Sequence, residues 1–209
     1  MMMNNGLSIS LINTGKRYNR DWIFRNCTLD IRPGTTCAII GPNGSGKSTL
    51  LQVIAGAMLH NEGKVNYQAD DKDIESPFSY ISIAAPYLHL IEQMTALEAI
   101  SFHKTFKSLS ADASVILGAV GLRSAANKQV RYFSSGMKQR LKLGLAFFSE
   151  TPVLLLDEPA TNLDADGIAL YKELVAHHTS GRTVIVSSND PQEYDFCTEI
   201  IRINDYKPE

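Results

Sequence analysis

The chain has 209 residues, of which 44% are apolar and 20% are charged, and its formal net charge at pH 7 is −2. This length suits one domain and leaves no room for a second full catalytic unit, and the apolar content excludes a disordered tail. A balance this close to neutral argues against a general nucleic-acid binder, which needs a basic surface.

No segment predicts a membrane-spanning helix, which needs about 20 apolar residues. The longest uncharged stretch, residues 76–91, is 16 residues long and contains Pro77 and Pro86. The first residues have neither a basic region nor a long apolar run, so no secretory signal is expected. The three cysteines are scattered and form no CxxC pair, which argues against disulfides and structural zinc and favours a reducing compartment.

The predicted elements alternate between strand and helix along most of the chain. Strands are predicted at 7–12, 23–31, 36–40, 64–67, 79–83, 153–156, 183–187 and 200–203. Helices are predicted at 48–55, from a possible capping box at 95–98 to about 107, and at 115–120, 137–148 and 168–178. Strand–loop–helix alternation with very apolar strands predicts a parallel α/β sheet, and the helical stretch from about Pro86 to Phe148 is interpreted as a lobe inserted into it.

A glycine-rich loop separates the predicted strand at 36–40 from the helix that follows. It matches the phosphate-binding pattern G-x-x-x-x-G-K-[ST] at every fixed position and reads Gly41, Pro42, Asn43, Gly44, Ser45, Gly46, Lys47, Ser48, with Thr49 after it. Glycines let backbone N–H groups point at phosphate oxygens, and the helix presents its positive end to the same anion. Lys47 would contact the β and γ phosphates, and the Ser48 hydroxyl would bind Mg²⁺. The alternative is a glycine turn that binds nothing.

Two acidic residues, Asp157 and Glu158, follow the apolar run at 153–156. A buried strand that ends in aspartate would put a carboxylate beside the phosphate site. Asp157 would then hold the metal through water, and Glu158 would polarise the attacking water as a general base. The alternative is a strand that ends in two solvated acids, which the phosphate loop on the same chain disfavours.

With a third motif, the chain resembles the ATP-binding cassette (ABC) ATPases. The motif Phe133-Ser134-Ser135-Gly136-Met137 stands where that family has its signature, roughly L-S-G-G-Q, 23 residues before Asp157. The variant S-S-G-M-K-Q-R looks like that of cassettes that serve small multi-component exporters. The resemblance implies that Ser134, Ser135 and Gly136 clamp the γ-phosphate of a nucleotide held by the other subunit of a dimer. The alternative is a serine–glycine N-cap on a core helix.

The resemblance implies roles for two further parts of the sequence. Tyr18 lies 29 residues before Lys47, where the family places an aromatic ring that stacks on adenine; the alternative is a strand tyrosine that packs on the rim. The run from Ala160 to Asp164 resembles the family's loop that crosses the dimer contact. Asp164 is equally suited to be a helix N-cap.

The sequence departs from the family pattern at two places. The family usually has a histidine after the last core strand that contacts the γ-phosphate, and Asn189 stands there instead, able to donate a hydrogen bond but not to be protonated. The family also has a glutamine near the metal, expected around residues 83–86, where none stands; Gln93 comes about seven residues too late. Nucleotide binding with slow hydrolysis is therefore predicted.

The resemblance covers residues from about 7 to 203. It implies an α/β P-loop NTPase with a parallel-sheet RecA-like core, an N-terminal antiparallel β subdomain and an inserted α-helical lobe. The whole chain, 1–209, would be one ABC ATPase domain, with the sheet core at about 1–84 and 150–209 and the helical lobe at about 85–149.

The function that the resemblance implies is ATP binding and hydrolysis for an ABC transporter, with export favoured over uptake. ATP and Mg²⁺ would be the cofactors, and no nucleic acid is expected to bind. A homodimer or a paired ABC subunit would act on a separate transmembrane permease, docked beside residues 85–93. The chain would be cytoplasmic and peripheral on the inner face of the cell membrane.

Two alternatives of other classes remain. A soluble ABC-type nucleotide switch with slow hydrolysis and no transport role is favoured by the two departures. The chain, however, has neither the long coiled-coil insert of DNA-repair cassettes nor the second cassette of ribosome-acting ones. A degenerate scaffold that binds ATP only for stability is disfavoured because Lys47, Asp157 and Glu158 are all present.

Overall fold

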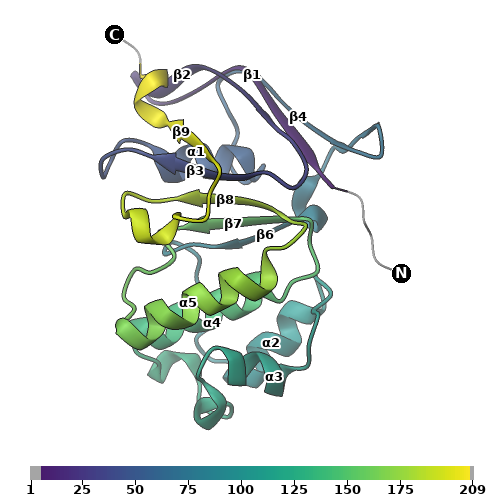
Figure 1. Cartoon of the computed structure of the whole chain (residues 1–209), viewed down its shortest axis with the longest axis vertical. Coiled ribbons are helices and arrows are strands. Elements are labelled where there is room, and N and C mark those ends of the chain that lie inside the picture. The colour runs from purple at the N-terminus through teal and green to yellow at the C-terminus, as the bar shows by residue number, and fades with distance from the viewer. Residues whose placement is uncertain (1–5, 208–209) are drawn as a thin grey trace.

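The computed structural model describes residues 6–207, which form stacked layers (Figure 1). The strands are β1 (Ser8–Tyr18), β2 (Asp21–Ile31), β3 (Thr36–Ile40), β4 (Glu62–Ala69), β5 (Lys72–Asp73), β6 (Ile81–Ala84), β7 (Val153–Asp157), β8 (Thr183–Ser187) and β9 (Glu199–Arg202). The helices are α1 (Lys47–Ile54), α2 (Ala96–Lys104), α3 (Ala113–Ala119), α4 (Ser135–Phe147) and α5 (Ala165–His178). In Figure 1 an antiparallel sheet lies at the top, α1 and a parallel sheet lie below it, and α2 to α5 lie at the bottom.

The five-stranded sheet is parallel throughout, with the order β6-β7-β8-β3-β9. Strands β7 and β8 are buried along their whole length, as expected for inner strands of a parallel sheet that is covered on both faces. The register pairs Ser187 with both Asp157 and Ile39. The carboxyl ends of β3, β7 and β8 therefore meet at one edge of the sheet, which confirms the predicted parallel α/β architecture.

The four-stranded sheet is antiparallel, with the order β2-β1-β4-β5. Strand β1 was expected to end at residue 12, but it continues to Tyr18 because it pairs with β2 through a hairpin at Tyr18–Asp21. The pairing shifts register between Leu11 and Thr14, and Asn13 there takes a left-handed φ of 48°. This bulge interrupts the regular pairing of β1 close to the residue where the predicted strand ended.

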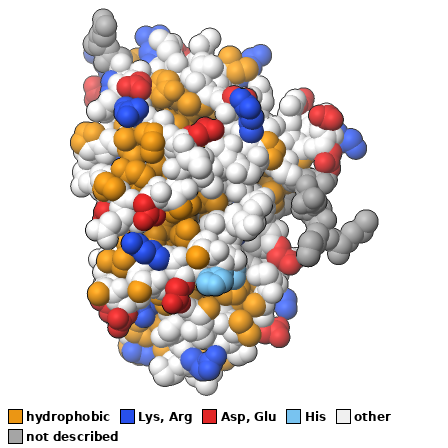
Figure 2. Space-filling model, in the orientation of Figure 1, with side chains coloured by type: hydrophobic (Ala, Val, Ile, Leu, Met, Phe, Trp, Pro, Cys, Tyr) orange, Lys and Arg blue, Asp and Glu red, His pale blue; other side chains and the backbone are white. Residues whose placement is uncertain are grey.

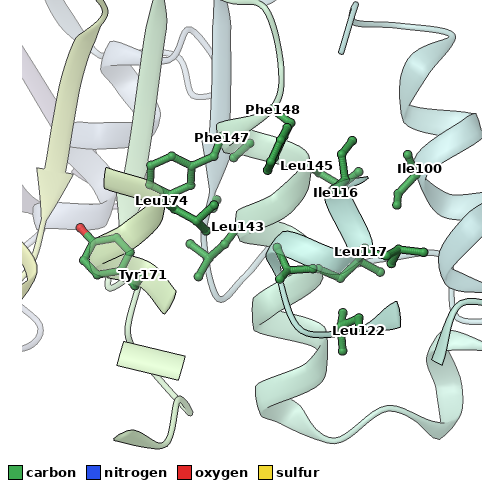
Figure 3. Packing of buried hydrophobic residues seen from close by; sticks show 14 of the residues in the cluster. Ile100, Ile116, Leu117, Leu122, Leu143, Leu145, Phe147, Phe148, Tyr171 and Leu174 are labelled. Atoms are coloured by element: carbon green, nitrogen blue, oxygen red, sulfur yellow. The ribbon is translucent and has the colours of Figure 1, made fainter. Parts of the chain in front are cut away.

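The parallel sheet buries a different apolar cluster on each face. Along β7, Leu154 and Leu156 face the cluster formed with α2 to α5, whereas Val153 and Leu155 face α1 and the antiparallel sheet. Figure 3 shows the first cluster, where Phe147 of α4 meets Tyr171 of α5 edge to face with ring centroids 6.2 Å apart. Helix α4 thus packs on the sheet as well as on its helical neighbours.

Several predicted boundaries were wrong by a few residues. The strand expected at 79–83 is a 3-10 turn at Pro77–Tyr80 followed by β6 at Ile81–Ala84, because Pro77 favours a helical turn start. The capping box of α2 is confirmed, since Thr95 and Glu98 exchange both hydrogen bonds, but the helix ends at Lys104 rather than 107. Within residues 6–207, no helix is both long and apolar enough to cross a membrane.

Candidate nucleotide-binding site

The glycine-rich loop has a conformation that its glycines make possible. Gly44 and Gly46 take left-handed φ values of 76° and 101°, and Gly46 stands directly before the first turn of α1. A Cβ on Gly46 would lie 2.3 Å from Cγ2 of Ile23, so a larger residue would collide with β2. The close approach of Gly46 to Ile23 therefore fixes the loop against β2 at the start of α1.

Lys47 lies inside this loop rather than in solvent, with only 4% of its surface exposed. Its Nζ donates hydrogen bonds to the carbonyl oxygens of Gly41, at 3.0 Å, and of Pro42, at 3.3 Å. A buried ammonium group is costly unless such partners satisfy it. The loop therefore concentrates positive charge from Lys47 and the helix N-terminus at one point, as an anion-binding site requires.

The loop shares a cavity of about 210 Å³ with a residue that is distant in sequence, Glu158. The lining comprises Ile23, Asn43, Gly44, Gly46, Lys47, Ser48, Thr49 and Glu158. This volume is below the roughly 300–1,000 Å³ of pockets that enclose a whole small molecule. The cavity accordingly suits a chain of phosphates, with a carboxylate at its wall.

Glu158 adopts a strained backbone with φ of 42°, which is uncommon for a residue with a side chain. Its backbone N–H donates to the Ser187 carbonyl oxygen at 2.8 Å, across the ends of β7 and β8. Its Oε2 accepts from Oγ1 of Thr161 at 3.4 Å. Glu158 is thus fixed at the cavity wall by its neighbours on the sheet edge.

Asp157 is 1% exposed, and neither of its carboxylate oxygens has a hydrogen-bond partner among residues 6–207. Burial raises the pKa of this carboxyl, and the nearby hydroxyls of Ser48 and Ser187 oppose that rise. Two unsatisfied buried oxygens beside a serine hydroxyl fit a hard divalent cation. The part of the chain that the structure describes has no group of three or more potential His, Cys, Asp or Glu ligands, so such a cation would take its other ligands from phosphate and water.

Asn189 lies just beyond β8, beside the glycine-rich loop. Its side-chain Nδ2 donates to Oδ1 of Asn43 at 3.1 Å. The structure thus places the amide at the loop, although 146 residues separate the two asparagines.

The segment after β6, where no glutamine stands, contains Tyr87, whose phenol interacts electrostatically with Asp157. The Tyr87 hydroxyl is buried and has no hydrogen-bond partner within the described range. Burial, and then the negative charge of Asp157, raise the pKa of this phenol. Sequence reasoning missed Tyr87; the only signal was a polar ring close to Ala84 and Ala85, which are themselves buried.

The signature-like residues line a second, larger cavity of about 460 Å³ that contains no residue of the glycine-rich loop. It is lined by Gly121, Leu122, Ser124, Ala125, Ser134, Ser135, Gly136, Met137, Arg140, Asn162 and Asp164. Ser134 is the N-cap of α4 and accepts from the Met137 N–H at 3.2 Å, so the capping alternative is correct as a structural role. On one chain, therefore, the signature and the loop occupy separate cavities.

Two other residues singled out from the sequence lie outside the first cavity. Asp164 is the N-cap of α5; its Oδ1 accepts from Gly167 N–H at 2.8 Å and from Arg140 at 2.6 Å. Tyr18 is 46% exposed, and its hydroxyl donates to Sδ of Met58 at 3.1 Å. Its hairpin also carries Ile23, which lines the cavity.

Comparisons with known proteins agree with this geometry. The family model described as ABC transporter matches residues 24–161. The uncharacterised ABC transporter ATP-binding protein YybJ of Bacillus subtilis is 28% identical, over 94% of this chain and 92% of its own. The cytochrome c biogenesis ATP-binding export protein CcmA of Nitrobacter winogradskyi is 32% identical, over 79% of this chain and 83% of its own. The lantibiotic transport ATP-binding protein SrtF of Streptococcus pyogenes is 29% identical, over 92% and 85%.

Solved structures show the same similarity. The ATP-binding cassette MJ0796, described as a dimer in a post-hydrolysis state bound to ADP and Pi, has a TM-score of 0.79 and 25% identity, and the match covers 96% of each chain. A bacterial Atm1-family ABC exporter with ATP bound also has a TM-score of 0.79, at 19% identity, over 94% of this chain and 37% of the exporter. At that identity the exporter supports the fold alone.

Proposed function

The chain belongs to the ABC transporter family as an ATP-binding, ATP-hydrolysing subunit, and from this premise we propose which of its residues perform each step. The observation that carries the proposal is the cavity that joins the glycine-rich loop to Glu158. It puts a cationic phosphate cradle and a carboxylate on the same small volume. That combination is what phosphoryl transfer to water requires.

Binding would depend on residues 41–49. The backbone N–H groups of the loop would donate to phosphate oxygens. The Lys47 ammonium would exchange its present partners, the carbonyl oxygens of Gly41 and Pro42, for phosphate oxygens. Ser48 and Asp157 would hold Mg²⁺, which supplies charge neutralisation on the β and γ phosphates when bound. Tyr18 would stack on the adenine ring, since it stands in the hairpin beside the cavity and is half exposed.

Hydrolysis would use Glu158 as the general base that takes a proton from the attacking water. Asn189 would donate its amide hydrogen bond to the γ-phosphate, for which its position beside Asn43 is suitable. An amide cannot become cationic, so turnover is expected to be slow relative to members with histidine at this position. The fixed left-handed backbone of Glu158 would lower the cost of orienting its carboxylate toward the water.

Two copies of the chain, or this chain and a paired ABC subunit, would close over two ATP molecules. The separation of the signature cavity from the loop cavity supports this, because Ser134, Ser135 and Gly136 meet no phosphate loop on their own chain. The N-terminus of α4 would then add its positive end to the partner's γ-phosphate. The dimeric state described for MJ0796 supports the same arrangement.

Closure would move a separate transmembrane permease, with the chain held at the cytoplasmic face of the membrane. Export is favoured over uptake because relatives include proteins named for lantibiotic transport and for export in cytochrome c biogenesis. The contact with the permease would lie beside residues 85–93, where the helical lobe, at about 85–149, joins the sheet core, at about 1–84 and 150–209. On the face shown in Figure 2, basic and acidic side chains are interspersed, which gives no basic surface for nucleic acid.

The test is dimerisation of Glu158→Gln with ATP and Mg²⁺, followed by size-exclusion chromatography. The amide cannot accept the proton, so ATP should stay intact and hold two subunits together. Glu158→Gln combined with Lys47→Ala should remain monomeric, because the phosphates lose their cation. A Glu158→Gln protein that binds ATP but elutes as a monomer would exclude the homodimer, and co-purification with a second ABC subunit would then decide for a paired one.

A further inference from the structure

One peptide unit beyond Glu158 is held on both of its polar atoms by buried side chains. The Pro159 carbonyl oxygen accepts from Nε2 of Gln139 at 2.8 Å. The N–H of the same peptide, which belongs to Ala160, donates to Oε1 of Glu193 at 2.8 Å. Gln139 and Glu193 are only 3% and 6% exposed, so neither bond competes with bulk water.

These two side chains come from the two segments that the proposed mechanism connects to phosphate. Gln139 lies in α4, three residues after the signature glycine Gly136. Glu193 lies in the 3-10 turn Pro191–Glu193, four residues after Asn189. The peptide between Pro159 and Ala160 is therefore the point where the signature helix, the strand end that carries Glu158 and the segment after Asn189 meet.

The segments that carry Gln139 and Glu193 are themselves held by hydrogen bonds. The Tyr171 hydroxyl, from α5, donates to the Glu193 carbonyl oxygen at 2.6 Å and is buried with its ring against Phe147. Helix α4 is also held by Lys142, three residues after Gln139, whose Nζ donates to the carbonyl oxygens of Ala85 and Pro86 at 3.1 and 3.0 Å. A shift of α4 would therefore act together on the start of the helical lobe and on the peptide between Pro159 and Ala160.

We propose that Gln139 and Glu193 are positioning residues for Glu158. By holding both ends of one peptide dipole they fix the second peptide plane after Glu158, between Pro159 and Ala160. The ring of Pro159 fixes its own φ, so little freedom remains between this plane and the left-handed backbone of Glu158. A peptide with only one end held could rotate about the other, and the carboxylate would lose its aim at the water. This inference rests on the proposed role of Glu158 as the base and adds that the signature helix sets its orientation.

Variants that keep side-chain volume and remove one hydrogen bond test the proposal. Gln139→Met removes the donor and Glu193→Met removes the acceptor, whereas Glu193→Gln keeps an acceptor oxygen. We expect kcat for ATP to fall by about 10- to 100-fold in both methionine variants, with the KM for ATP within about two-fold of the wild type. Glu193→Gln should stay within about three-fold of the wild-type kcat.

A second readout separates positioning from folding. Because binding is kept while chemistry slows, the methionine variants should hold an ATP-bound dimer for longer than the wild type on a size-exclusion column. The matched control is Tyr67→Phe, which removes a buried hydroxyl that donates to Val53 and Ile54 carbonyl oxygens far from Glu158. It should lower the thermal midpoint without changing kcat.

The outcomes are distinguishable. Wild-type kcat in Gln139→Met and Glu193→Met, or a parallel loss of ATP affinity and kcat in both, would overturn the positioning role while leaving the proposed function intact. The same holds if Glu193→Gln is as slow as Glu193→Met. A wild-type protein that binds ATP but does not hydrolyse it would overturn the assignment of Glu158 as base, and this inference with it.

Discussion

Asn189 donates a hydrogen bond from Nδ2 to Oδ1 of Asn43, 3.1 Å away, and so joins the end of β8 to the phosphate-binding loop. The contact fixes where the amide lies when no nucleotide competes for it. Because Asn189 is near the loop without being part of it, its replacement can test hydrolysis separately from phosphate binding by the loop.

We expect Asn189→His to hydrolyse ATP faster, by about 10-fold. Removal of one preorganised donor typically slows a reaction by about 100- to 1,000-fold, and the asparagine amide already recovers part of that. Steady-state phosphate release at saturating ATP is the measurement. Asn189→Ala is the control, and it should be slower than the wild type. A histidine variant no faster than the wild type would show that the asparagine does not limit turnover.

Lys47→Ala should weaken ATP binding by about 100-fold or more. A charged hydrogen bond contributes about 1.5–3 kcal/mol, and Lys47 would make at least one to the phosphates. Isothermal titration calorimetry gives the dissociation constant directly. Lys64→Ala, on the exposed face of β4, serves as the control and should bind as the wild type does. Equal affinity in the two variants would disprove the phosphate cradle.

Gly46→Ala should be destabilising by more than the same change at Gly181. Both glycines have a left-handed φ, 101° and 74°, which costs an alanine roughly 1–3 kcal/mol. Only at Gly46 would the added Cβ also collide with Ile23, whereas nothing lies within 4 Å at Gly181. Urea unfolding measures the loss of free energy of unfolding in each variant. Equal losses would mean that β2 moves away from the loop and the added Cβ does not collide with Ile23.

The stability of Glu193→Gln relative to the wild type should depend on pH. Burial raises the pKa of Glu193 above its unfolded-state value, with the Ser188 hydroxyl and the Ala160 amide in partial opposition. Protonation of Glu193 therefore stabilises the folded state. This stabilisation is complete below the pKa of the unfolded state and is lost as the pH rises through the pKa of the folded state. Urea unfolding at pH 5 and pH 8 measures the free energy of unfolding of both proteins. The value for the variant, relative to the wild type, should be higher at pH 8 than at pH 5; a relative value that does not change with pH contradicts this.

Local motifs explain what could be predicted from the sequence. The strand at 36–40, the loop after it and the start of α1 depend on neighbours within a few residues, and the structure has them almost as expected. The site brings Lys47 and Glu158 to one cavity because parallel strands align their carboxyl ends. That alignment follows from the alternation of strands and helices, which is visible in the sequence.

Contacts between distant segments could not be predicted in the same way. Gln139 reads as one polar residue on an amphipathic helix, and nothing near it in sequence shows that its amide reaches Pro159. Tyr87 was missed because the family pattern predicts an amide near residues 83–86, and a buried phenol in that segment has no established pattern. The roles of such residues can be assigned only when the structure shows which distant residues they contact.

The most direct test of the central claim is a crystal structure of Glu158→Gln grown with ATP and Mg²⁺. We expect each γ-phosphate to lie between Lys47 of one copy and the Ser134–Gly136 segment of the other, with the metal against Ser48 and Asp157. Nucleotide bound away from residues 41–48, or a loop that remains closed on Lys47 at saturating ATP, would contradict the account.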